Sequence, residues 1–97
     1  MQVLATHPYY KVQRHVSSTE QKDIEEEREL ILYKDKICSQ YREFPIQKVF
    51  DISYRMIGRD VGFLYLHTSK GVYSYKIKST PEQFIDAYKR EINKSSF

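Results

Sequence analysis

The sequence has no tryptophan, a single cysteine and no long apolar run, and each of these absences limits what the protein can be. Cys38 cannot form an internal disulfide on its own, which favours a reducing compartment, and we therefore expect the cytoplasm. No stretch approaches the roughly 20 apolar residues of a membrane-spanning helix, so we expect no transmembrane segment. The start of the chain also lacks the basic flank and apolar run of a secretory signal.

The charge is small in total and uneven along the chain. The 97 residues carry a net charge of +3, with 30% charged and 40% hydrophobic residues, which is ordinary for one small globular domain. Residues 17–29 hold six acidic residues against two basic ones, so the remainder of the chain carries +7. A charge of this size does not indicate a nucleic-acid-binding protein. We interpret the acidic segment as a solvated surface or as a docking site for a basic partner.

The N-terminal part combines a weak strand signal with this acidic segment. Side chains alternate along "YKVQRHV" at 10–16, which predicts a strand. Between residues 17 and 29 only Ile24 is apolar, and Ser18 followed by Gln21 resembles a helix-capping box. Two interpretations stay open for this segment: a short exposed helix, or a flexible acidic loop.

The stretch from residue 30 to residue 45 predicts a hairpin followed by a corner. "LILY" at 30–33 and "ICSQY" at 37–41 flank "KDK", where Asp35 can hydrogen-bond its own backbone in a turn. Pro45 then interrupts the pattern, because proline lacks a backbone donor for a sheet. We therefore interpret "EFP" as a corner of the chain.

Three further strands are predicted between residues 47 and 78. In "QKVFDISYRM" one face carries Phe50, Ile52, Tyr54 and Met56. "FLYLHT" at 63–68 is apolar on both faces, which is typical of a central strand. Gly71 is suited to a positive φ angle in the tight turn that follows. One side of "VYSYKIK" then carries Tyr73, Tyr75 and Ile77.

After residue 79 the period of the apolar side chains becomes that of a helix. Thr80 is suited to the N-cap, Pro81 to the first helical position, and Gln83 to a capping box. The apolar side chains form one stripe: Phe84, Ile85, Tyr88 and Ile92. Because this helix is the one element available to cover the strands, we predict a bent antiparallel sheet, or a partly open β-barrel, capped by one C-terminal helix.

Three stretches carry a likeness to a known family: "ELILYKDKI", "REFPIQKVFDISYRMIG" and "GFLYLHTSKGVYSYKIKSTPEQFIDAYK". In them a hairpin leads to "FPI", a glycine-flanked "LYLHT" strand pairs with "GVYSY", and a "PEQF" helix follows. Residues 29–92 thus resemble the bacterial pleckstrin-homology-like domains of short Bacillus-type proteins. The resemblance implies a β-barrel closed by the C-terminal helix. The family usually has seven strands, whereas the sequence here indicates six at most, and Phe84 or Tyr88 stands where eukaryotic members carry a tryptophan.

The resemblance also raises lipid binding, because eukaryotic members bind phosphoinositides through basic residues of the first hairpin. The corresponding stretch "KDKICSQYR" offers Lys34, Lys36 and Arg42, with Asp35 between the two lysines. An anionic lipid headgroup is therefore an alternative ligand.

The residues do not indicate an enzyme or a metal centre. The candidate nucleophile is Cys38, and the candidate bases are His7, His15 and His67. Cys38 lies in a predicted strand, where cysteine is usually a small buried side chain rather than a reactive thiolate. His67 has no second ligand at nearby positions, whereas a metal site needs three or four. We expect no catalytic residue, no cofactor and no metal.

Tyrosines beside basic residues suggest RNA stacking as a further alternative. The candidates are Tyr54, Tyr65, Tyr73 and Tyr75, with Arg55, Lys76 and Lys78 near them in the sequence. Tyr54 shares its predicted face with apolar side chains, so we expect it in the core. No basic stripe accompanies the tyrosines, which makes RNA the weaker alternative.

These patterns predict a mainly β protein in two segments. Residues 1–28 form an N-terminal strand and acidic segment, which can belong to the same domain, and residues 29–97 form the pleckstrin-homology-like domain. The predicted function is non-enzymatic binding of a protein partner or of a second copy, through an open sheet edge or the groove between sheet and helix. Binding of anionic lipid, and then of RNA, are the alternatives. The sequence specifies neither the partner-binding residues nor the oligomeric state.

Overall fold

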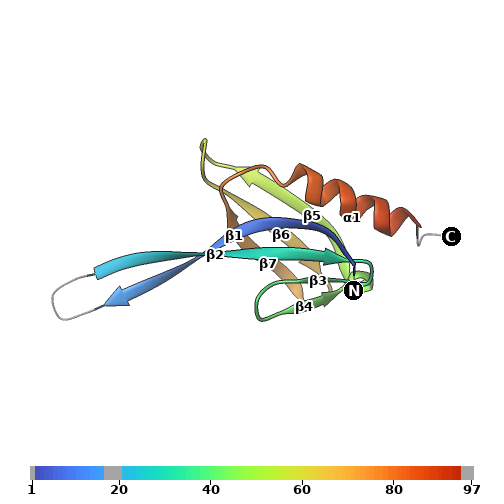
Figure 1. Cartoon of the computed structure of the whole chain (residues 1–97), viewed down its shortest axis with the longest axis horizontal. Helices are drawn as coiled ribbons and strands as arrows, with labels where there is room; N and C mark the ends of the chain where they lie inside the picture. Colours follow the sequence, from blue (N-terminus) through green and yellow to red (C-terminus); the bar gives the residue numbers. More distant parts are fainter. Residues whose placement is uncertain (1, 17–20, 95–97) are drawn as a thin grey trace.

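Seven strands and one α-helix form the fold in the described residues, 2–16 and 21–94 of this computed structural model (Figure 1). The strands are β1 (Val3–Val16), β2 (Gln21–Tyr33), β3 (Lys36–Cys38), β4 (Glu43–Pro45), β5 (Val49–Met56), β6 (Gly62–Thr68) and β7 (Gly71–Ile77). A short 3-10 helix, η1 (Ile46–Lys48), precedes β5, and helix α1 (Glu82–Lys94) follows β7.

All seven strands belong to one antiparallel sheet in the order β4-β3-β2-β1-β7-β6-β5. Strand β1 stands at the centre and joins the two halves, with a bridge to β7 at Tyr10 and Lys76. Helix α1 runs alongside the bent sheet (Figure 1). The prediction of a mainly β protein with one covering helix is confirmed. The sheet is not closed, because β4 and β5 are its two edges, and it has one strand more than the sequence indicated.

The core lies between the inward face of the sheet and helix α1. Six aliphatic side chains of the sheet are fully buried: Leu30, Leu32, Ile37, Leu64, Leu66 and Ile77. From the helix, Phe84 and Tyr88 are each 1% exposed, and Ile92 packs against the same cluster. Burying a ring of this size contributes about 2 kcal/mol. The predicted helical stripe is therefore confirmed.

The helix begins one residue later than predicted. The Pro81 carbonyl accepts a hydrogen bond from the amide of Ile85 at 3.0 Å, so Glu82 is the first helical residue. Pro81 therefore stands at the position predicted for the Thr80 N-cap, and it is itself buried against the core.

One residue of β5 departs from the predicted alternation. Ile52 is buried as expected, but Phe50 is 65% exposed and Val49 is 4% exposed. The register with β6 shifts between Val49 and Asp51, so Phe50 is the extra residue of a β-bulge. The inward placement of Phe50 is wrong, because the bulge turns its ring outward.

The acidic segment is a strand, so the helix and loop interpretations are both wrong for its described part. Strand β2 begins at Gln21 and pairs with β1 along its whole length. Opposite charges such as Lys11 and Glu26 face each other across this ladder, which favours the pairing. Ser18 of the predicted capping box lies outside the described residues.

The shorter connections lie where the sequence predicts turns, with one exception. The hairpin of β2 and β3 turns at Lys34 and Asp35, and Gly71 has a φ angle of +130°. The exception is "EFP", which is the short edge strand β4 and not a corner. Pro45 is tolerated there because an edge strand needs fewer backbone donors, and the chain turns immediately afterwards in η1.

Strands β1 and β2 continue beyond the body as a two-stranded ribbon (Figure 1). Residues 11–16 of β1 pair with residues 21–26 of β2, and in the described part of the chain they pair with no other strand. We call these residues the arm. Because of it the molecule is 59 Å long but only 27 and 25 Å across.

Strands β5 and β6 approach so closely at Gly62 that we expect no larger side chain to be tolerated there. A Cβ atom there would lie 2.5 Å from the Met56 sulfur and 2.6 Å from the Arg55 carbonyl oxygen. We expect Gly62→Ala to lower the free energy of unfolding by about 2 kcal/mol or more, because the backbone oxygen cannot yield without shifting the strand. Urea denaturation measures this loss.

Gly58→Ala is the matched control, since its Cβ would meet no atom closer than 3.5 Å. We expect it to stay within about 0.5 kcal/mol of the unsubstituted protein. Equal stability of the two variants would contradict the register of β5 and β6.

Candidate functional site

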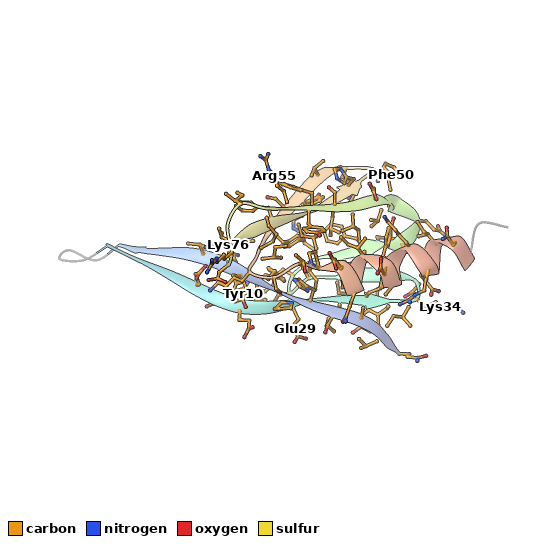
Figure 2. The ribbon with its side chains drawn as sticks, turned by 90° about the horizontal axis from the view of Figure 1, so that it is seen from above. Tyr10, Glu29, Lys34, Phe50, Arg55 and Lys76 are labelled. Atoms are coloured by element: carbon orange, nitrogen blue, oxygen red, sulfur yellow. The ribbon has the colours of Figure 1, made fainter. Side chains whose placement is uncertain are left out.

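Charged side chains of β2 and of residues 76–78 fix the root of the arm, where it leaves the body near Tyr10 and Glu25, to the body. The Glu25 carboxylate accepts hydrogen bonds from Lys76 at 2.6 Å and from Lys78 at 3.1 Å. The Lys78 ammonium also lies 4.4 Å from the centre of the Tyr10 ring. The hydrogen bonds from Lys76 and then Lys78 lower the pKa of Glu25. Figure 2 shows Tyr10 and Lys76 together at this root.

Beyond the root the arm presents two open backbone edges. Within the described residues no strand lies beside the outer edge of 11–16 or of 21–26. The first edge is basic, with Lys11 and Arg14, and the second is rich in acidic residues. A two-stranded ribbon in water is marginally stable without further packing. Such a ribbon can gain stability by adding an extended segment of another chain to one edge.

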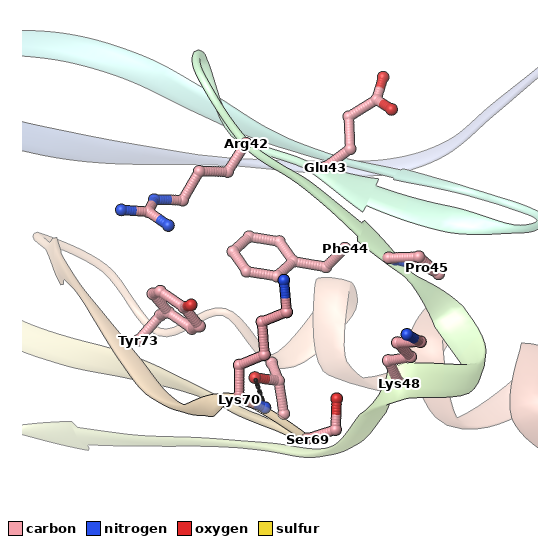
Figure 3. A pocket seen from close by; sticks show the side chains of 9 residues that line it. Arg42, Glu43, Phe44, Pro45, Lys48, Ser69, Lys70 and Tyr73 are labelled. Carbon is pink, nitrogen blue, oxygen red and sulfur yellow. Dashed lines mark hydrogen bonds between the residues drawn. The ribbon is translucent and has the colours of Figure 1, made fainter.

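A cavity of about 270 Å³ lies between the edge strand β4 and the turn that joins β6 to β7 (Figure 3). Its lining residues are Arg42, Glu43, Phe44, Pro45, Lys48, Thr68, Ser69, Lys70 and Tyr73. The Ser69 amide donates to the Lys48 carbonyl at 3.0 Å, which holds the turn against η1. The Thr68 hydroxyl donates to the Gly71 carbonyl at 2.8 Å and accepts from the amide of Lys70, which orders the turn itself.

The cavity is positively charged and has an aromatic wall. The Arg42 guanidinium lies 5.0 Å from the centre of the Tyr73 ring, and Phe44 lies 5.0 Å from the same ring. The Glu43 carboxylate points away from the cavity (Figure 3) and accepts a hydrogen bond from Lys36 at 3.2 Å. The charged lining residues that can contact a ligand are therefore Arg42, Lys48 and Lys70. This arrangement suits a small group that carries negative charge.

The three basic residues singled out from the sequence do not form one site. Their hairpin is the second of the chain, since β1 and β2 form the first. Lys34 is exposed in the β2–β3 turn (Figure 2), and Lys36 is engaged with Glu43. Arg42 alone lines the cavity. Sequence reasoning missed Lys48 and Lys70, because only the tertiary fold brings η1 and the β6–β7 turn beside Arg42.

The four tyrosines considered for RNA stacking divide between two faces of the sheet. Tyr54, Tyr73 and Tyr75 pack against the core. Tyr65 alternates with the buried Leu64 and lies on the outer face. The four rings therefore do not form one stacking platform.

The cysteine and histidines have separate surroundings. Cys38 is partly buried in β3, and burial raises the pKa of its thiol. The Nε2 atom of His7 lies 3.2 Å from the Ser79 carbonyl, and that of His67 lies 2.8 Å from the Ser53 hydroxyl. The side chain of His15 lies outside the described residues. Among the residues that are described, no group of three His, Cys, Asp or Glu side chains is placed to hold a metal ion.

The predicted groove between sheet and helix is present as a hollow of about 490 Å³ between β1 and α1. Its lining combines Asp86 and Arg90 of the helix with Leu4 and Thr6 of the strand. Because charges of both signs line it beside small and apolar side chains, this groove favours no one class of ligand.

No protein-family model matches the chain, and no curated protein matches it. Among the described residues, no helix has both the length and the apolar character needed to cross a membrane. The arm and the cavity are therefore the features that bear on function.

We call the contacts of Glu25 with Lys76 and Lys78 the clamp. The clamp predicts a measurable shift in the titration of the Glu25 carboxyl group. Because its folded-state pKa is lowered, Glu25 stabilises the root above its ordinary pKa of 4.5, and this contribution is lost as the pH falls through the lowered value. We expect the double variant Lys76→Gln/Lys78→Gln to move the pKa of Glu25 back towards 4.5. Carboxyl-detected NMR titration measures it. An unchanged Glu25 titration in the double variant would contradict the clamp.

Proposed function

We propose that this chain is a non-enzymatic interaction module that binds a protein partner through the arm. The observation that carries the proposal is the continuation of β1 and β2 beyond the body with both outer edges unpaired in the described residues. An open edge forms backbone hydrogen bonds with an added strand, and these bonds supply affinity without a deep pocket.

The charge of β2 as a whole favours a basic partner strand on the outer edge of this strand. Strand β2 carries five acidic residues against two basic ones. Glu25 and Glu26 are engaged within the chain, the latter with Arg28 at 2.6 Å. Glu29 is exposed on the part of β2 that lies in the body, outside the arm (Figure 2). Surplus negative charge along an edge speeds association with a basic segment and disfavours acidic ones.

We further propose that the chain is a pleckstrin-homology-like domain of a bacterial protein that acts in the cytoplasm. Seven antiparallel strands followed by a C-terminal helix agree with the resemblance and support the proposal, whereas the sheet is open where the resemblance implies a closed barrel. The free Cys38 thiol is consistent with a reducing compartment.

Shortening the arm tests its role. Val12 and Glu25 are register partners, so residues 13–24 can be replaced by Asn-Gly, a two-residue hairpin turn, without disturbing the Glu25 clamp. We expect the shortened protein to keep the thermal unfolding of its body, because the core lies outside the arm. It should lose the proteins that the full chain retains from cell extract, quantified by mass spectrometry.

Glu29→Lys and Asp60→Lys form a matched pair for the charge argument, since both residues are exposed and only the first lies on β2. We expect Glu29→Lys to weaken capture of the same partner and Asp60→Lys to leave it unchanged. Undiminished capture by the shortened protein would show that the arm does not bind the partner.

A second candidate function is binding of an anionic lipid headgroup in the basic cavity. It is supported by three cationic side chains around a space of about 270 Å³ whose acidic residue points away. Each cation near an anionic membrane contributes about 1 kcal/mol, and salt screens this attraction.

Vesicle flotation distinguishes this candidate from the arm. We expect Lys48→Ala/Lys70→Ala to reduce binding to phosphatidylserine vesicles at least about tenfold at low salt, since two cations are lost. The control Lys89→Ala/Arg90→Ala removes the same charge from exposed positions of α1 and should have a smaller effect. Equal effects would indicate general charge attraction without a site, and no binding at low salt would reject the candidate.

A further inference from the structure

The outer face of strands β5, β6 and β7 is apolar along its middle and is not covered by any described part of the chain. Strand β6 turns Leu64 and Leu66 into the core and Phe63, Tyr65 and His67 outward. The Phe63 and Tyr65 rings lie 6.5 Å apart, and all three outward side chains are partly exposed. A strand that is apolar on both faces is usually buried on both sides. Here one side is still open.

The antiparallel register arranges this face as three rows across the strands. The rows are Asp51 with His67 and Val72; Ser53 with Tyr65 and Ser74; and Arg55 with Phe63 and Lys76. One charge therefore stands near each end of β5, and three rings follow the middle strand. Figure 2 shows Arg55 and the bulged Phe50 on the side of the molecule away from helix α1.

Neither charged side chain of β5 has an ion-pair partner within the described residues. Asp51 and Arg55 are exposed, and neither takes part in an ion pair there. They are four residues apart on one strand, about 13 Å, so they cannot pair with each other. Lys76, the third charge of the face, is already bound to Glu25.

We propose that this face is the contact between two copies of the chain, stacked about a two-fold axis through the row of Ser53, Tyr65 and Ser74. This symmetry places Asp51 of each copy against Arg55 of the other, so two ion pairs form at once. Tyr65 then meets Tyr65 of the other copy, and Phe63 meets His67. The same two-fold symmetry therefore pairs the free charges and covers the exposed rings.

A nucleic-acid strand fits the face less well than a second copy. Asp51 would repel phosphate groups, and Lys76 is shared with Glu25. Arg55 is then the one cation of the three rows that is free in the described chain to bind a phosphate. Nucleic-acid surfaces instead carry a stripe of cations beside their stacking rings.

The size of the face predicts a weak dimer. Three strands about 4.8 Å apart, over five residues each, make a patch smaller than a standard stable interface. We expect a dissociation constant of about 10 µM or higher. The face lies on the body and not on the arm, so this inference does not rest on the proposed arm function.

Sedimentation velocity from about 10 µM to about 1 mM measures the association. We expect Asp51→Arg or Arg55→Asp alone to weaken it at least about tenfold, because each creates two like-charged pairs. The double variant restores opposite charges and should return to within about threefold of the original constant. Asp86→Arg, an exposed position on α1, is the control for the change in net charge and should leave the constant unaltered.

The protein with the shortened arm keeps this face and should dimerise as before. Loss of association in that protein would assign it to the arm and overturn the inference. A strict monomer at every concentration, unaffected single variants, or a double variant without rescue would each overturn it as well. Binding of a single-stranded RNA oligomer that is abolished by Tyr65→Ala would also overturn it, in favour of a stacking surface.

Discussion

Strands β1 and β2 share one antiparallel register from Ala5 and Leu32 in the body to Val16 and Gln21 in the arm. The other features of the molecule depend on this pairing. In the body it places Leu30 beside His7 in the centre of the sheet, where both are buried. Farther along it sets basic positions of one strand opposite acidic positions of the other, which stabilises a ribbon with no core of its own. Folding of the body therefore also positions the arm.

Closure of the core depends on helix α1 because the sheet does not close on itself. The β1–β7 bridge joins the two halves, and the rings of Phe84 and Tyr88 are buried in a core cluster to which both halves contribute. The Tyr88 hydroxyl donates to the Val49 carbonyl at 2.8 Å. The buried phenol of the helix therefore gives a backbone carbonyl of the edge strand β5 its hydrogen-bond partner. One short helix covers one face of the sheet, and the opposite face of β5, β6 and β7 remains available for contacts.

Local patterns in the sequence are sufficient for much of this fold. Period-two alternation identifies β5 and β7, and a run that is apolar on both faces identifies β6. Gly71 marks the turn between β6 and β7, and the helical stripe identifies α1. The acidic segment could not be assigned locally, because its strand depends on complementary charges about fifteen residues away, such as Lys11 with Glu26. The bulge at Phe50 leaves the composition of the strand unchanged and is invisible to alternation alone. The cavity joins η1 to a distant turn, so neither Lys48 nor Lys70 carries a local signal.

Three surfaces of the described chain are available for binding: an arm with open edges, a basic cavity, and an uncovered aromatic face. The arm is the feature that distinguishes this chain most, and its existence depends on β2 being a strand. Nuclear Overhauser contacts test that directly. We predict cross-strand contacts between backbone protons of Lys11 and Glu26 and of Arg14 and Asp23, which are register partners. Helical contacts between residues three apart within 21–29, without cross-strand contacts, would contradict the account.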